Sequence, residues 1–199
     1  MLMALAAEAG FSVVDGGCLP DNAGLLAERL AELAGEVNLI VSSAGASVGD
    51  EDNSLKAAEA AGFTCEALRI AMKPGKPAVV GRSGATAYLG LPGNPLSAFI
   101  SWNILGGAMA AALAGRERPL PQGLSVPAAN RFGHKPGRPE FVPARLVTRE
   151  GVTAAELLGH GVSGHLKPLA SAEGLVEIAA ASGAVSPGDA VRFHPFCLF

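Results

Sequence analysis

Residues 37–50, VNLIVSSAGASVGD, combine a short apolar run with a loop of serines, glycines and alanines. An apolar run of this kind is typical of a strand that is buried on both faces, as in parallel sheets. Small residues after such a strand let backbone amides approach an anion, and the start of the next helix favours negative charge. The stretch therefore predicts a strand that ends in an anion-binding loop, although Gly and Ser also fill ordinary turns.

Helical and strand patterns alternate on either side of this stretch, which predicts an α/β domain with a doubly wound, mostly parallel sheet. Asn22 is placed to cap one helix and Gly35 to end it. The chain opens with a helix where such folds usually open with a strand, so we expect the first strand to precede Met1. Helices are expected at 2–9, 23–34, 54–61 and from Pro95 onward, and strands at 11–14, 37–41, 63–72, 78–81 and 86–91.

The second part of the chain has a different composition. Residues 1–115 carry 6 basic and 11 acidic side chains, whereas the remainder carries 9 and 7. A charged, proline-rich linker is expected at 116–123, between a first domain at 1–115 and a second at 124–199. Short β-like runs separated by Gly and Pro turns predict that the second domain is a small all-β barrel, with strands at 124–128, 140–149, 175–180 and 190–196.

Composition restricts the classes of function. Of the 199 residues, 49% are hydrophobic and 17% charged, which is typical of a folded chain. A net charge of −3 and an aromatic content of 5% argue against nucleic-acid binding. Three widely spaced cysteines form no disulfide framework and favour a reducing cytoplasm. The uncharged stretch 95–114 is long enough to span a bilayer, but its Ser, Asn and Gly residues favour a buried core helix, and no membrane association is expected.

Acidic residues follow the central strand and its loop. Asp50, Glu51 and Asp52 are consecutive, and Asp21 follows an earlier predicted strand. Hard cations such as Mg²⁺ prefer carboxylate oxygens, so this group is a candidate metal site. Acidic residues at a helix start also complement its dipole, and Asp21 could instead share the capping role of Asn22.

Two further loops carry rigid turns. Lys73-Pro74-Gly75-Lys76-Pro77 holds two ammonium groups on a proline-stiffened turn, which suits a di-anion but also suits a solvated surface turn. The run from Gly90 to Pro95 (Gly-Leu-Pro-Gly-Asn-Pro) lies between a strand and the long helix and would present backbone amides there.

Taken in order, three motifs are far more specific than any one of them: SSAGASVGD at 42–50, MKPGKP at 72–77 and GLPGNPLSA at 90–98. The series resembles the molybdopterin molybdenumtransferases, the MoeA-type enzymes related to the gephyrin E domain. The resemblance continues into the second domain through RFG at 131–133, KPGRPEF at 135–141 and SGH at 163–165. It implies an enzyme that binds adenylated molybdopterin and molybdate, cleaves the adenylate with a divalent cation such as Mg²⁺, and works as a homodimer.

The resemblance also implies roles for individual residues. Asp21 and Asp52 would lie near metal and molybdate, Lys73 and Arg69 would bind the anionic ligand, and two prolines would shape the pocket. A cation and Lys73 would stabilise charge developing on the adenylate. The expected set comprises the catalytic residues Asp21, Asp52 and Lys73, the metal ligands Asp21, Asp50 and Asp52, and the substrate contacts Ser43, Gly45, Ser47, Gly49, Arg69, Lys76, Pro92, Gly93, Asn94 and Pro95.

The sequence departs from the family pattern in several places. Ala44 replaces a usual glycine, Arg69 stands where Lys is frequent, and relatives carry two domains before this region. A non-catalytic molybdopterin-binding or scaffold module is therefore the alternative function. Another member of the same fold, such as a nucleotide amidohydrolase partner, agrees less well with the C-terminal β domain. A metal site at His160 and His165 lacks a standard ligand spacing.

Overall fold

The computed structural model describes residues 1–43, 53–116, 123–159 and 166–196, and the chain divides into two compact units. Unit 1 comprises Met1–Ile70 and Gly75–Arg118. Unit 2 comprises Ala71–Pro74 and Pro119–Phe199. The four residues Ala71–Pro74 thus interrupt unit 1 in the sequence but pack with unit 2.

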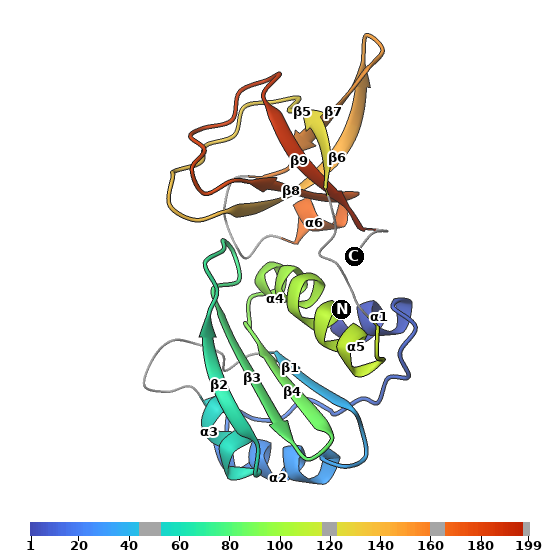
Figure 1. The fold of residues 1–199 in the computed structure, drawn as a ribbon, viewed down its shortest axis with the longest axis vertical. Coiled ribbons are helices and arrows are strands. Elements are labelled where there is room, and N and C mark those ends of the chain that lie inside the picture. The colour runs from blue at the N-terminus through green and yellow to red at the C-terminus, as the bar shows by residue number, and fades with distance from the viewer. Residues whose placement is uncertain (44–52, 117–122, 160–165, 197–199) are drawn as a thin grey trace. The chain divides into compact units, whose positions relative to one another are not determined.

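The sheet of unit 1 has four strands in the order β1-β4-β3-β2 (Figure 1). β1 runs parallel to β4, whereas β4 is antiparallel to β3 and β3 to β2. The prediction of a mostly parallel sheet is therefore wrong for the described strands. Two residues, Gly84 and Ala85, join β3 to β4, and so short a connection permits only an antiparallel hairpin. The strands are β1 (Leu39–Ser43), β2 (Thr64–Arg69), β3 (Pro77–Ser83) and β4 (Thr86–Leu91).

Helices cover both faces of this sheet (Figure 1). Tyr88 and its neighbours on one face pack against α2 and α3, and Leu89 and its neighbours on the other face pack against α1 and α4. Successive residues of a strand point to opposite faces, so β4 contributes to both layers. Doubly wound connectivity stays a prediction. The helices are α1 (Leu2–Glu8), α2 (Ala23–Leu33), α3 (Asn53–Ala60), α4 (Pro95–Ser101) and α5 (Gly107–Leu113), with a π-helical turn η1 (Trp102–Gly106).

Local sequence signals predicted most of these elements. The Asn22 side chain accepts hydrogen bonds from the backbone N–H groups of Gly24 and Leu25, at 2.9 and 3.1 Å, which confirms the predicted cap of α2. The predicted strand at 11–14 is wrong: the structure has no strand there, and Phe11 and Val14 are exposed. A strand needs a pairing neighbour, which β propensity alone does not supply.

Helix α4, turn η1 and helix α5 are continuous from Pro95 to Leu113. By length and composition alone this helix could cross a membrane, with a mean hydropathy of 1.5, yet 44% of its most apolar stretch is buried. The core helix of a soluble protein passes the same test. Ala98, Ile100 and Trp102 are almost completely buried, in keeping with the predicted core helix.

Unit 2 is built on a five-stranded antiparallel sheet in the order β5-β9-β8-β6-β7. The sheet curls, because its outer strands β5 and β7 approach each other at a bridge between Ala128 and Ala155. Its core contains Phe132, Val176 and Phe193. The elements are β5 (Leu124–Pro127), β6 (Glu140–Arg149), β7 (Val152–Leu157), the short helix α6 (Lys167–Ala170), β8 (Gly174–Ile178) and β9 (Ala190–Pro195); β7 and α6 were not predicted.

Candidate functional site

Three of the predicted site loops begin at the same end of the unit 1 sheet. Ser43 at the end of β1 is in register with Leu91 at the end of β4. β3 is antiparallel to β4, so its first residue, Pro77, starts at this same edge, opposite Arg69 at the end of β2. Carboxyl ends of strands are where open α/β sheets bind ligands. The loops that follow β1, β2 and β4 therefore leave the sheet together.

Asp21 lies against the start of α3. Its Oδ1 accepts a hydrogen bond of 2.9 Å from the Asn53 side-chain amide, and the Asp21 side chain is exposed. Asn53 is the first residue of α3 and directly follows Asp52 in the chain. The fold thus brings Asp21, from the segment before α2, beside the residue that follows the acidic run.

Most of the small-residue loop lies outside the described residues, including Gly45, Ser47, Gly49, Asp50 and Asp52. Ser43 is described and exposed. Its neighbour Ser42 makes a 2.8 Å hydrogen bond with the hydroxyl of the fully buried Tyr88. This contact fixes the carboxyl end of β1, just before the loop begins. His160 and His165 also lie outside the described residues.

The turn after β4 is rigid. Pro92 is buried, Gly93 is exposed, and Asn94 caps α4, which has Pro95 in its first turn. The Asn94 Oδ1 accepts from the Ser97 backbone N–H at 3.1 Å and from the Ser97 hydroxyl at 3.3 Å. The predicted start of a helix at Pro95 is confirmed, the Asn94 cap was not predicted, and the turn stands at the carboxyl end of β4.

Arg69 and the two lysines of the second motif divide between the two units. Arg69 and Lys76 belong to unit 1 and are exposed. They flank a closed turn in which the Ile70 N–H donates to the Lys76 carbonyl at 2.7 Å. Lys73 belongs to unit 2, where its Nζ lies 2.8 Å from Glu140 Oε1.

Glu140 was not anticipated as a site residue. The residue is 3% exposed, and its Oε2 lies 2.9 Å from Nδ1 of His134, which is also buried. A second histidine of unit 2 has a similar partner, since His194 Nε2 lies 2.9 Å from Glu177 Oε2. One signal was available: alternation in β6 places Glu140 on the same face as the core residues Val142 and Ala144, and a buried carboxylate requires partners.

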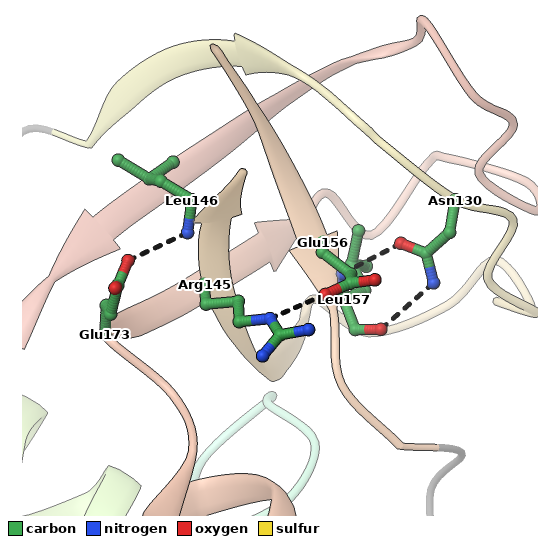
Figure 2. Close-up of polar contacts among 6 residues, drawn as sticks. All are labelled: Asn130, Arg145, Leu146, Glu156, Leu157 and Glu173. Atoms are coloured by element: carbon green, nitrogen blue, oxygen red, sulfur yellow. Dashed lines mark hydrogen bonds and ion pairs between the residues drawn. The ribbon is translucent and has the colours of Figure 1, made fainter. Parts of the chain in front are cut away.

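A separate cleft of about 770 Å³ lies within unit 2. Figure 2 shows two of its lining residues, Arg145 on β6 and Glu156 on β7, paired at 2.6 Å. It also shows the Asn130 side chain bound to both backbone groups of Leu157, at 2.9 and 3.0 Å. Each of these polar side chains thus has a partner: the Arg145–Glu156 pair links β6 to β7, and Asn130 ties the segment after β5 to the end of β7.

Comparison with protein families gives two matches. Residues 1–111 match the family described as "Probable molybdopterin binding domain". Residues 125–196 match the family described as "MoeA C-terminal region (domain IV)".

Individual relatives agree with the family matches. The chain is 30% identical to the molybdenum cofactor synthesis protein cinnamon of Drosophila melanogaster, over 97% of this chain and 34% of that protein. It is 28% identical to the molybdopterin molybdenumtransferase of Haemophilus influenzae, over 92% of this chain and 46% of that protein. The chain thus spans between a third and a half of the length of these curated relatives.

Solved structures show the same fold. The molybdopterin biosynthesis MoeA protein of Pyrococcus horikoshii superimposes with a TM-score of 0.77 at 23% identity, over 98% of this chain and 46% of that one. A molybdenum cofactor biosynthesis protein of Pyrococcus furiosus superimposes with a TM-score of 0.67 at 17% identity, over 96% and 63%.

Proposed function

The chain belongs to the MoeA-type molybdopterin-binding family, and from that premise we propose that it is a molybdopterin molybdenumtransferase. It would bind adenylated molybdopterin and molybdate, release AMP and leave molybdenum on the pterin dithiolene. The observation that carries the proposal is the convergence of the loops after β1, β2 and β4 at one sheet edge. We place the protein in molybdenum cofactor biosynthesis in the cytoplasm.

The hydrogen-bond donors at this end of the sheet would bind the anionic substrate. The exposed Ser43 and Arg69 stand at the ends of their strands, and the turn after β4 supports the start of α4. Hydroxyl, guanidinium and backbone N–H donors are the groups that bind phosphate oxygens. The proposed contacts are Ser43, Gly45, Ser47, Gly49, Arg69, Lys76, Pro92, Gly93, Asn94 and Pro95.

Three acidic residues would hold a divalent cation. The exposed carboxylate of Asp21 is a hard oxygen donor, and its bond to Asn53 keeps it beside the residue that follows Asp52 in the chain. Asp21, Asp50 and Asp52 are therefore the proposed ligands of Mg²⁺, which prefers such oxygens. When bound, the cation would neutralise charge on the phosphates. The ammonium group of Lys73 would stabilise the same negative charge.

Release of AMP tests this proposal. With adenylated molybdopterin, molybdate and Mg²⁺, the wild-type chain should release AMP. Asp52→Ala and Lys73→Ala should each release AMP about tenfold more slowly or slower still, because a charged contact contributes about 1.5–3 kcal/mol. The matched control is Lys167→Ala, which removes an exposed lysine of α6 outside the proposed set. Equal rates in all four proteins would contradict the assignment.

One alternative to a transferase is a non-catalytic molybdopterin-binding or scaffold module. A binding or scaffold module would bind adenylated molybdopterin without releasing AMP, so binding and turnover are measured separately. We also propose that the chain forms a homodimer, which light scattering would test by showing twice the mass of 20.0 kDa.

A further inference from the structure

Glu140 is a buried carboxylate held between a cation and an imidazole. Its side chain is 5% exposed, and its two oxygens have different partners: Oε1 lies 2.8 Å from Lys73 Nζ and Oε2 lies 2.9 Å from His134 Nδ1. A carboxylate removed from water is costly unless its oxygens are paired. Here both oxygens are paired, and the imidazole, only 2% exposed, fixes the orientation of the carboxylate from within the unit.

The main chain of Lys73 is fixed by the neighbours of Glu140. The Lys73 N–H donates to the Pro139 carbonyl at 2.9 Å, and the Phe141 N–H donates to the Lys73 carbonyl at 2.8 Å. Residues 139–141 therefore hold both the backbone and the ammonium group of Lys73.

The Lys73 ammonium group keeps N–H donors that Glu140 does not use. An ammonium has three N–H donors, and Glu140 takes one of them. The Lys73 side chain remains 48% exposed, so further donors face solvent. A flexible lysine that is already oriented loses less conformational entropy when it binds an anion.

We propose that Glu140 is a positioning residue, which orients the Lys73 ammonium for the phosphate of adenylated molybdopterin and is itself oriented by His134. This inference rests on the proposed function. Glu140 acts on the ligand only through Lys73, so its effect should vanish once the ammonium group is removed.

A double-mutant cycle on ligand affinity tests this dependence. The dissociation constant for adenylated molybdopterin is measured for the wild type, Lys73→Ala, Glu140→Gln and the double variant. Gln keeps the size of Glu but removes its charge. Lys73→Ala should weaken binding tenfold or more and Glu140→Gln about three- to tenfold, by loss of a charge-assisted contact. The double variant should bind as Lys73→Ala does, because coupled residues are not additive.

A matched control separates this role from general damage to unit 2. Glu156→Gln removes another ion-paired glutamate of the same unit, the partner of Arg145, and should leave the dissociation constant unchanged. If Glu140→Gln weakens binding by the same factor with and without Lys73, Glu140 acts through the fold and the inference is overturned. Wild-type affinity in Glu140→Gln would also overturn it. No binding by the wild-type chain would instead reject the proposed function, and the inference with it.

Rescue provides a test that keeps Glu140 in place, should Glu140→Gln not fold. Lys73→Ala removes three methylenes and the ammonium, a gap that n-propylammonium matches in size and charge. Millimolar n-propylammonium should restore affinity several-fold in Lys73→Ala and leave the wild type unchanged. Absence of rescue would show that Glu140 does not position an ammonium for the ligand.

Discussion

The polar side chains of this protein differ in what the sequence reveals about them. Asn22 was predicted as a cap, because a helix N-terminus demands a short polar side chain and Asn22 stands directly before a helical pattern. Glu140 was not predicted, because its partners lie 67 residues upstream (Lys73) and 6 residues upstream (His134), and only the folded chain brings them together. Local rules therefore find caps but not long-range ion pairs.

Cys65 offers a test at the scale of one residue. Burial, and secondarily the negative charge of Glu59, raise the pKa of the Cys65 thiol. The thiolate is the reactive form, so a raised pKa lowers reactivity at a given pH. In a Cys197→Ser background, iodoacetamide at pH 8 should alkylate Cys65 more slowly than the exposed Cys18, as followed by peptide mass spectrometry.

The same experiment has an internal check. Glu59→Gln removes the secondary cause of the shift and should speed alkylation of Cys65 without changing that of Cys18. Glu59→Gln should remove only the smaller part of the shift in the Cys65 pKa, because burial is the larger cause. Faster alkylation of Cys65 than of Cys18 in the Cys197→Ser protein with Glu59 intact would be inconsistent with the burial described.

At the scale of elements, strands with long β-forming runs were predicted closely. The strands at 86–91 and 140–149 have the predicted bounds. β7 was missed because its sequence, Val-Thr-Ala-Ala-Glu-Leu, is poor in strong β formers, and because the turn before it places Glu150 at a φ of 51° beside Gly151 at 78°. The sheet order of unit 1 also escaped prediction, since pairing depends on connections that periodicity does not encode.

Close packing between β8 and β9 yields a prediction for Gly174. A Cβ at this position would meet the His194 carbonyl oxygen and, at 2.6 Å, the ring of Phe193. Gly174→Ala should therefore lower the free energy of unfolding by about 1–3 kcal/mol, the usual cost of overpacking a core. Urea denaturation followed by circular dichroism measures the change.

Gly183→Ala is the matched control for this substitution. A Cβ at Gly183 meets nothing within 4 Å, and its backbone has no positive φ. Its free energy of unfolding should stay within about 0.5 kcal/mol of the wild type, as for most surface changes. Equal destabilisation by the two substitutions would show that β8 and β9 are not packed as described.

At the scale of the whole molecule, two units with separate cores should unfold separately. Trp102, the single tryptophan, is buried in the core of unit 1 and reports on that unit alone. Circular dichroism reports on both units. Gly174→Ala, in unit 2, should shift the circular dichroism transition in urea while leaving the midpoint seen by Trp102 fluorescence unchanged. Equal shifts with both probes would mean that the units unfold as one cooperative body.

The family was predictable from motif order, because three short motifs follow one another in a specific series whatever the pairing of the strands between them. The matches at 1–111 and 125–196 agree with that interpretation. The central proposal is that the chain is a molybdopterin molybdenumtransferase.

Transfer of molybdenum tests that claim most directly. The chain is incubated with adenylated molybdopterin, molybdate and Mg²⁺, and an apo-molybdoenzyme is added to report the finished cofactor. Activity of the reporter enzyme should appear only when the chain, molybdate and the adenylated substrate are all present, and Lys73→Ala should reduce it about tenfold or more, in line with one charged contact. Reporter activity that is the same with and without the chain would contradict the assignment as a molybdenumtransferase.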